Sequence, residues 1–246
     1  MNEITYLTEQ VRLAVPDLSE EQAAQLYTYY QRLVEKNQVM NLTAITEFTE
    51  VVRKHFIDSL MLFQAVDREI LQTPLNVLDL GTGAGFPGIP LKIAYPALNV
   101  VLVDSLNKRV KFLQEVIDEL GLKGITAIHG RAEDVGRDPM YREKMDLVVS
   151  RAVANLATLS EYCLPLVKLG GAFIPYKSGA VNEEAADAKK AIYLCAGKLE
   201  EIIPYELPGE TGAEVMGRSL IVIRKTGPIS KKYPRNPGKP AKEPLR

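Results

Sequence analysis

Hydrophobic and polar positions alternate with two different periods along the chain, and the change of period divides it. Up to about residue 70 the apolar positions recur every three or four residues, which predicts amphipathic helices. The first such segment, 19–37, opens with Ser19 and Gln22 in the spacing of a capping box. Its expected apolar face holds Ala23, Tyr27, Tyr30 and Val34, and that of a second segment, 46–63, holds Val52, Phe56, Leu60 and Phe63. Residues 1–70 are therefore predicted to form an N-terminal helical extension.

From residue 76 onward the pattern consists of short apolar runs with little polar alternation. The runs at 76–80, 99–104, 125–129, 145–150 and 171–176 are typical of strands buried on both faces of a parallel sheet. Helical segments such as 106–121, which stops at Gly121, separate them. The alternation predicts an α/β domain over residues 71–226, with a doubly wound, mostly parallel sheet. Two last runs, 198–207 and 218–225, are expected to pair in antiparallel fashion.

The end of the chain, 227–246, differs in composition from the rest. It holds five prolines and little apolar surface, which predicts a tail without regular structure. The net charge of the chain is −1 and does not point to nucleic acid. Nine Lys or Arg residues and one acidic residue nevertheless lie between Arg218 and the end, so positive charge is concentrated there.

Metal, disulfide and membrane chemistry find little support in the sequence. Cys163 and Cys195 lie in apolar contexts that favour buried thiols, and His55 and His129 are isolated. No apolar run approaches the roughly 18–20 residues that span a bilayer, and the acidic start lacks the apolar core of a secretory signal. We therefore expect a cytoplasmic protein without a metal or membrane partner, and we favour a monomer.

A glycine-rich loop, 81–88, directly follows the first predicted strand. Its glycines stand at 81, 83, 85 and 88, and a chain needs such residues where it turns tightly or approaches a ligand closely. No Gly-Lys-Ser/Thr follows, which excludes a Walker A loop, whereas Gly83, Gly85 and Gly88 fit the spacing of a dinucleotide fingerprint. Asp79 precedes them in a D-x-G-x-G-x-G pattern, and a carboxylate there suits the cationic amino group of a sulfonium nucleoside better than a diphosphate. The loop thus favours S-adenosylmethionine (AdoMet), with NAD(P) as an alternative.

Polar residues follow the next strands as well. Asp104 ends the second strand, where a carboxylate can accept hydrogen bonds from a ribose diol of either nucleotide. Ala132 and Glu133 follow the third strand, at the expected place of an adenine edge. After the fourth strand comes Ser150-Arg151, without the Asn/Asp-Pro-Pro-aromatic turn of amino methylases and without a loop cysteine. An acceptor such as a ring nitrogen, which needs placement rather than a base, is therefore favoured.

Seven stretches in order resemble the RsmG family, formerly called glucose-inhibited division protein B. They are NLTAIT, HFIDSL, VLDLGTGAGFPGIPL, DSLNKRVKFL, GRAED, VSRAVA and KKYPRNPGKPAKEPL. The resemblance implies a class I AdoMet-dependent methyltransferase with a Rossmann-like, seven-stranded sheet and an antiparallel C-terminal strand. It also implies methylation of N7 of guanine 527, in the 530 loop of bacterial 16S rRNA in the 30S subunit.

The resemblance assigns roles to individual positions. AdoMet would contact Gly81, Phe86, Ala132, Glu133 and Arg151 in addition to the loop residues above, with Asp104, Ser105 and Leu106 against its ribose and adenine. The catalytic candidates near the transferred methyl group are Asn41, Arg131 and Arg151. The family often has Trp-Asn where this chain has Lys36-Asn37, so a stacking contact is not expected here.

RNA would have to be held by local positive charge, because the net charge is close to zero. The candidate cations are Lys108, Arg109, Lys111, Arg224, Lys225, Lys231, Lys232, Arg235 and Lys239. We expect the proline-rich tail to form an extended strap, along the phosphate backbone or back across the domain. Two other functions stay open from the sequence: a ribosome assembly factor that binds AdoMet without turnover, and an NAD(P)-dependent oxidoreductase.

Overall fold

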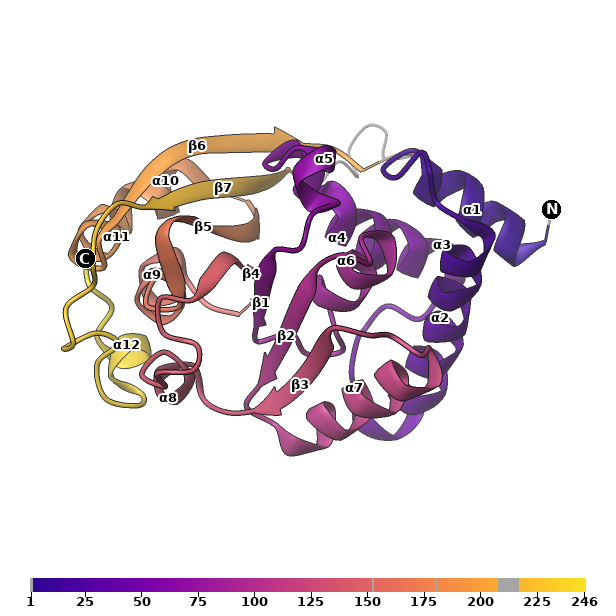
Figure 1. The fold of residues 1–246 in the computed structure, drawn as a ribbon, viewed down its shortest axis with the longest axis horizontal. Coiled ribbons are helices and arrows are strands. Elements are labelled where there is room, and N and C mark those ends of the chain that lie inside the picture. Colours follow the sequence, from indigo (N-terminus) through magenta and orange to yellow (C-terminus); the bar gives the residue numbers. More distant parts are fainter. Residues whose placement is uncertain (1, 152, 180, 208–216) are drawn as a thin grey trace.

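A seven-stranded sheet forms the centre of the computed structural model, which describes residues 2–151, 153–179, 181–207 and 217–246. The strand order is β3-β2-β1-β4-β5-β7-β6, with β1 to β5 parallel and β7 antiparallel to both of its neighbours (Figure 1). The strands are β1 Asn76–Leu80, β2 Asn99–Asp104, β3 Ile125–His129, β4 Met145–Arg151, β5 Val167–Ser178, β6 Gly197–Tyr205 and β7 Arg218–Lys225. All seven strands expected from the sequence are present, so the predicted doubly wound sheet and its antiparallel pair are confirmed.

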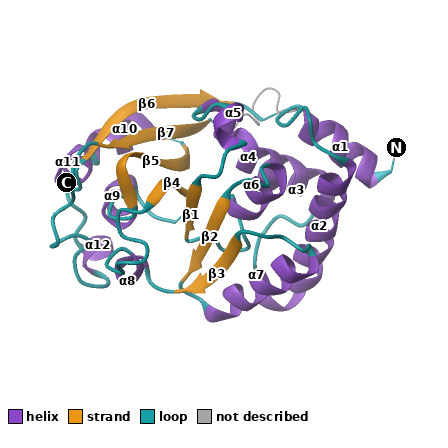
Figure 2. Ribbon diagram, viewed as in Figure 1, coloured by secondary structure: helices purple, strands orange, loops and turns teal. Residues whose placement is uncertain are grey.

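Helices cover both faces of this sheet (Figure 2). One group, called here the N-terminal helices, lies on the side of the sheet where the chain begins (Figure 1). It comprises α1 Glu3–Arg12, α2 Glu20–Met40, α3 Phe48–Val51, η1 Val52–Ile57, α4 Asp58–Leu60, η2 Met61–Gln64, α5 Arg68–Leu71, α6 Gly88–Ala94 and α7 Asn107–Glu119. The other group comprises α8 Ala132–Val135, α9 Leu156–Cys163, α10 Val181–Asp187, α11 Lys189–Leu194 and α12 Lys239–Lys242. None of the helices in the described ranges is long and apolar enough to cross a membrane.

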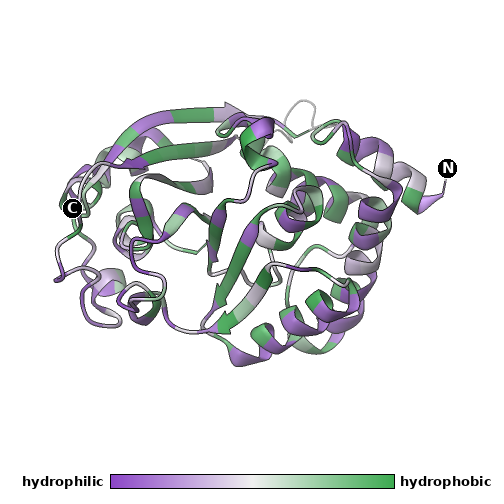
Figure 3. Cartoon of the chain, in the orientation of Figure 1, coloured by the Kyte–Doolittle hydropathy of each residue, from purple (hydrophilic) through white to green (hydrophobic). Residues whose placement is uncertain are grey.

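Alternate strand residues enter two separate apolar cores, one beneath each group of helices. Val77 of β1 and Leu102 of β2 pack with the N-terminal helices, whereas Leu78 and Val103 pack with α9, α10 and α11. Because successive side chains of a strand point to opposite faces, a strand between two cores must be apolar throughout. In Figure 3 the inner strands β2 and β7 accordingly appear mainly green, whereas the edge strand β6 and the helices carry both colours.

The N-terminal helices are present, with differences in detail. The capping box is formed in α2, where Ser19 Oγ accepts from Gln22 N and Gln22 Oε1 accepts from Ser19 N. The buried face of α2 consists of Ala23, Leu26, Tyr29 and Leu33. Only Ala23 of the predicted face is among them. At the other three positions the buried residue precedes the predicted one, Tyr27, Tyr30 or Val34, by one place. The second predicted helix is not continuous, because α3 passes into the π-helical turn η1 before α4 and η2. Val52, Phe56 and Leu60 of that segment are buried as expected, and Phe63 is half-buried.

The tail also differs from the expectation. It contains the short helix α12, which packs against α9, and Gly238 N donates to Glu133 of α8. The prediction of no regular structure is therefore wrong for residues 239–242. The order of the strands reverses between β1 and β4, since the chain adds β2 and β3 on one side and returns to add β4 on the other. Ligands of doubly wound sheets bind at such a switch point, beyond the carboxyl ends of the strands.

Candidate functional site

The glycine loop runs over the carboxyl end of β2. Gly81, Gly83 and Gly85 have φ values of +73°, +62° and +111°, a region that residues with a side chain rarely adopt. The backbone N–H groups of Gly81 and Thr82 donate to Val103 O at 2.9 and 3.1 Å and fix the loop to the sheet. A Cβ on Gly83 would meet no heavy atom within 4 Å, so the backbone lies bare on that side. The loop therefore leaves space beside its main chain.

Asp79 lies beneath this loop. Its carboxylate is fully buried, and Oδ2 accepts from Thr82 Oγ1 at 2.6 Å and from Gly88 N at 2.9 Å. Burial raises the pKa of Asp79 to about 6, although both hydrogen bonds act in the opposite direction. The structure thus places Asp79 as a support that joins the loop to the start of α6. The contact with a ligand's amino group, which the sequence suggested, stays a prediction.

A cavity of about 490 Å³ opens beyond the carboxyl ends of β1, β2 and β3. Seven of the residues predicted from the sequence line it: Gly81, Asp104, Ser105, Leu106, Arg131, Ala132 and Glu133. Leu106, one of these seven, and Val153, which was not predicted, are 43% and 42% exposed, so two apolar residues face the open space. A volume of this size with apolar walls and a few fixed polar groups is typical of a cofactor pocket.

Asp104 provides the best-defined polar group of the cavity. Only 3% of the residue is exposed, and Oδ1 accepts from Leu106 N at 2.8 Å while Oδ2 accepts from Gly83 N at 3.0 Å. Arg109 Nη1 lies 3.4 Å from Oδ2. Each carboxylate oxygen can accept more than one hydrogen bond, so Asp104 retains capacity for a diol. The fixed carboxylate, the bare loop and the apolar walls fit an adenosine group.

Glu133 forms the opposite polar part of the wall. It is 5% exposed, and its Oε1 accepts from Gly238 N, in the C-terminal tail, at 2.7 Å. Tyr162 of α9 lines the cavity next to it, and burial together with the adjacent Glu133 raises the pKa of Tyr162 to about 12. Tyr162 and Gly238 were not predicted as site residues, because their role depends on contacts between distant parts of the chain.

Arg151 and Phe86 lie in a different place from the seven residues above. Arg151 lines a second cavity, of about 450 Å³, and its Nη1 is 2.7 Å from Asp58 Oδ2. The guanidinium carbon is 5.0 Å from the centre of the Phe86 ring, which stacks on His55 at 4.5 Å. Burial and the adjacent Arg151 lower the pKa of His55 to about 3, so this imidazole is neutral at pH 7.

The remaining predicted residues line neither cavity. At Gly85 an added Cβ would stand 2.6 Å from Ile89 Cδ1 and 2.7 Å from Tyr29 Oη, so this glycine permits close packing. Asn41 is the exposed, left-handed C-cap of α2. Two residues later, Thr43 Oγ1 is 2.8 Å from His55 Nε2, so the turn 41–46 is attached to the wall of the second cavity.

The two cavities lie on either side of the end of β4. Arg151, its last residue, lines the second cavity, and Val153 lines the first. Tyr176 and Lys177 of β5, Tyr205 of β6 and Arg218 of β7 extend the second cavity away from β1. The switch point of the sheet therefore separates a nucleoside-sized pocket from a charged pocket, and a group at the end of β4 adjoins both.

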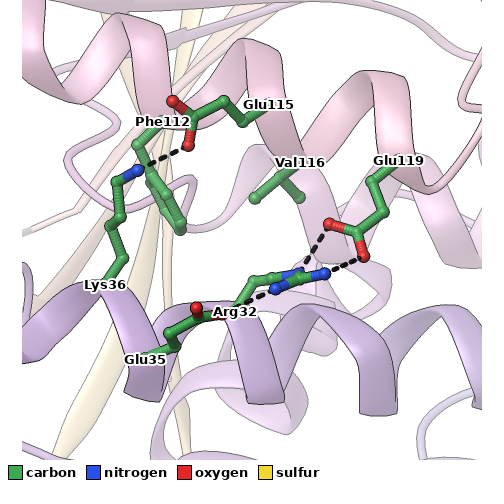
Figure 4. A pocket seen from close by; sticks show the side chains of 7 residues that line it. All are labelled: Arg32, Glu35, Lys36, Phe112, Glu115, Val116 and Glu119. Atoms are coloured by element: carbon green, nitrogen blue, oxygen red, sulfur yellow. Dashed lines mark hydrogen bonds and ion pairs between the residues drawn. The ribbon is translucent and has the colours of Figure 1, made fainter.

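A third hollow lies between α2 and α7 and is crossed by ion pairs (Figure 4). Lys36 Nζ is 2.7 Å from Glu115 Oε2, and Arg32 Nε is 2.7 Å from Glu119 Oε2. Lys36, the residue compared above with the family's tryptophan, thus points toward α7. Among the described residues, no group of three or more His, Cys, Asp or Glu side chains is placed to hold a metal ion.

The sheet order, with a cavity at its switch point, is that of the class I AdoMet-dependent methyltransferase fold. Solved structures with this fold include TYW2 of M. jannaschii in complex with AdoMet (TM-score 0.50, 15% identity, 65% of this chain and 75% of that chain). Another is a protein of Galdieria sulphuraria assigned as a sarcosine dimethylglycine methyltransferase (TM-score 0.55, 13% identity, 74% of this chain and 89% of that chain). At these identities the likeness shows the fold alone.

Sequence relatives identify the family. Residues 22–207 match the GidB family model, described as rRNA small subunit methyltransferase G, and the chain belongs to this family. A protein of Lachnoclostridium phytofermentans is 56% identical over 93% of this chain and 92% of its own, and one of Desulforamulus reducens is 50% identical over the whole of both. Both are named ribosomal RNA small subunit methyltransferase G. The family, fold class and cofactor inferred from the sequence are confirmed.

Proposed function

We propose that this protein transfers the methyl group of AdoMet to N7 of guanine 527 in 16S rRNA, with the small ribosomal subunit as its partner. Membership of the family supports a small-subunit rRNA substrate. The observation that carries the proposal is the pair of cavities on either side of the end of β4. A cofactor in one pocket and a nucleotide in the other would meet at that strand end.

AdoMet supplies an electrophilic methyl group on a positively charged sulfur. In the first cavity Asp104 would accept hydrogen bonds from the ribose hydroxyls, and Leu106 and Val153 would cover the faces of the adenine ring. Gly83 would let the ligand approach the main chain. Each of these groups is already held by the sheet or the loop, so binding requires little rearrangement, which favours a fixed orientation.

A ring nitrogen is the acceptor that this chemistry fits. N7 of guanine carries a lone pair, so its methylation needs neither a general base nor a covalent intermediate. Cys163 and Cys195 are buried, and burial raises the pKa of both thiols, that of Cys195 to about 12, so neither is a thiolate at neutral pH. The absence of a thiolate among these cysteines argues against attack on a ring carbon, and the proposed catalysis consists of proximity and orientation.

The second cavity supplies groups suited to a nucleotide. Lys54, Arg151 and Lys177 line it, and Arg151 presents the planar guanidinium that suits a phosphate or a purine edge. The ion pair with Asp58 fixes Arg151, since Asp58 is itself 6% exposed and also accepts from Tyr205 Oη at 2.8 Å. We therefore assign Arg151 to the acceptor side of the site rather than to the cofactor.

The test combines labelled AdoMet with 30S subunits from a strain that lacks the endogenous activity. Treatment with borohydride and aniline cuts RNA at N7-methylguanine, so one new cut in the 530 loop is expected. Label without a cut would refute the N7 assignment. No label, with AdoMet still bound, would indicate an assembly factor without turnover.

A glycine pair provides the matched control. Gly83→Val is expected to abolish both AdoMet binding and labelling, because the new side chain enters the open space beside the loop. Gly121→Val introduces the same residue at the same φ of +62°, also in open space, but at the end of α7. Normal AdoMet affinity in a folded Gly83→Val protein would show that the cofactor is placed wrongly.

A further inference from the structure

The C-terminal tail, residues 227–246, reaches the cofactor cavity through its main chain. Gly238 lines the cavity, and its N–H donates to Glu133 Oε1 at 2.7 Å, across 105 positions of sequence. Glu133 is 5% exposed, so a carboxylate with little access to water receives a hydrogen bond from the tail. The wall of the cavity is therefore built partly from a segment outside the α/β domain.

A buried ion pair holds the tail in this position. Glu161 of α9 is fully buried, and its carboxylate accepts from the backbone N of Arg235 at 2.7 Å, from Nε at 2.9 and 3.0 Å, and from Nη2 at 2.7 Å. Arg235 Nη2 also donates to Glu243 O at 2.8 Å, which closes the tail on itself. A bidentate, largely desolvated pair of this kind fixes geometry as well as charge.

Further bonds attach the tail on both sides of Arg235. Arg137 Nη2 donates to Pro234 O at 2.8 Å, and Arg142 Nη1 donates to Tyr233 O at 2.9 Å. Beyond Gly238, Thr158 Oγ1 donates to Pro240 O at 3.1 Å. The contacts come from side chains of the methyltransferase domain to main-chain atoms of the tail. They fix the path of the backbone and leave the tail lysines at the surface.

We propose that the tail is a component of the AdoMet site, with Gly238 contacting the cofactor pocket and Arg235 acting as a positioning residue. The Glu161–Arg235 pair fixes the main chain at 236–240, and Gly238 N–H then holds Glu133 in the wall of the cavity. This inference rests on the placement of AdoMet in the first cavity. It assigns the tail a role in cofactor affinity that does not depend on RNA.

The test measures binding of S-adenosylhomocysteine to the full-length protein by calorimetry. Arg235→Ala is expected to raise the dissociation constant at least tenfold, and Arg235→Lys, which keeps the charge but loses the fork, should give an intermediate value. Arg32→Ala is the matched control, because Arg32 also forms a two-bond pair with a carboxylate, Glu119, but on the exposed surface between α2 and α7, and it should bind as the unaltered protein does. Unchanged affinity in Arg235→Ala, or an equal loss in Arg32→Ala, would overturn the proposal.

Hydrogen exchange of the unaltered protein gives a second, independent measurement. Linkage is reciprocal, so a ligand that depends on the tail must also stabilise it. Saturating S-adenosylhomocysteine is therefore expected to slow exchange of the Gly238 amide, and exchange that does not change would overturn the proposal even if Arg235→Ala fails to fold. Asp104→Ala distinguishes a wrong cofactor site from a wrong role for the tail. If Asp104→Ala binds S-adenosylhomocysteine normally, the placement of the cofactor is wrong and the tail proposal fails with it. If Asp104→Ala binds weakly while Arg235→Ala binds normally, the placement stands and the tail proposal alone fails.

Discussion

Substitution of Asp79 by asparagine tests the raised pKa of this carboxyl group and its role as a support of the glycine loop. Asparagine keeps an oxygen that can accept from Thr82 Oγ1 and Gly88 N, but it carries no charge. The folded protein raises the pKa of Asp79 from its usual value of 3.8 to about 6, chiefly by burial. Well below pH 3.8 the carboxyl is neutral in both states. Above that value the unfolded chain ionises more readily, so the folded state loses stability until the pH exceeds about 6.

The size of this effect follows from the two pKa values. One pKa unit corresponds to about 1.4 kcal/mol, so a difference of about 2 units costs the folded protein about 3 kcal/mol at neutral pH. Between about pH 5 and about pH 7.5 the loss amounts to about 1.4 kcal/mol, because part of it has already occurred at the lower pH. An asparagine side chain does not titrate, so the stability of Asp79→Asn relative to the unaltered protein must rise by that amount over this interval.

Urea unfolding at about pH 5 and about pH 7.5 measures the difference. Asp118→Asn, at an exposed position of α7, serves as the control and should differ little from the unaltered protein at either pH. A free-energy difference for Asp79→Asn that is independent of pH, or that falls as the pH rises, would refute the reasoning. The same variant should bind AdoMet within a fewfold of normal if Asp79 only supports the loop. A loss of tenfold or more would instead favour the direct ligand contact suggested by the sequence.

Three further outcomes follow from buried groups. Folding lowers the pKa of His55 to about 3, so His55→Gln should gain stability relative to the unaltered protein as the pH falls from about 6.5 toward 3. Urea unfolding at about pH 5 and about pH 7.5 measures this change, whose direction with pH is opposite to that expected for Asp79→Asn. Gly88→Ala should lower the free energy of unfolding by about 1–3 kcal/mol, measured by urea, because its Cβ would clash with Leu102 Cδ2; a stability gain would show that the packing relaxes freely. Cys163 and Cys195 should resist a thiol reagent until unfolding and then react in full, and modification of either in the native protein would contradict their burial.

Four strands, β1, β2, β3 and β7, coincide with their predicted runs because the signal of a strand is local. β5 begins at Val167, four residues before the predicted run 171–176, and β6 ends at Tyr205 rather than at 207. The buried face of α2 was predicted less accurately than the strands. Tyr27 and Tyr30 have apolar rings that favour the core, but Tyr27 Oη donates to Glu3 at the surface, and Leu26 and Tyr29 take the buried positions. The π-helical turn η1 had no local signal.

The same distinction applies to the site. The glycine loop and Asp104 could be found because a positive φ and a strand-end carboxylate leave a trace in neighbouring residues. Gly238 and Tyr162 reach the cavity only through contacts between segments far apart in the chain, which spacing does not reveal. Arg151 was predicted both as a catalytic residue and as a cofactor ligand, and its ion pair with Asp58, from the N-terminal helices, holds it in the wall of the second cavity. That partner lies 93 positions away in sequence, so spacing does not reveal it.

The charge of the tail illustrates why composition alone overstates a docking surface. Arg235 is engaged with the buried Glu161. Lys225, the residue of β7 that precedes the tail and was also a candidate cation, is 1% exposed, with Nζ donating to Leu164 O at 2.8 Å. Contact of Lys225 with RNA would require it to leave the interior, and contact of Arg235 would compete with its bonds to Glu161. The exposed tail cations include Lys231 and Lys232, which lie in the same attached segment as Gly238, a residue of the first cavity. If RNA pairs with these lysines and AdoMet binds in that cavity, as we propose, substrate docking and cofactor retention would share one structural element.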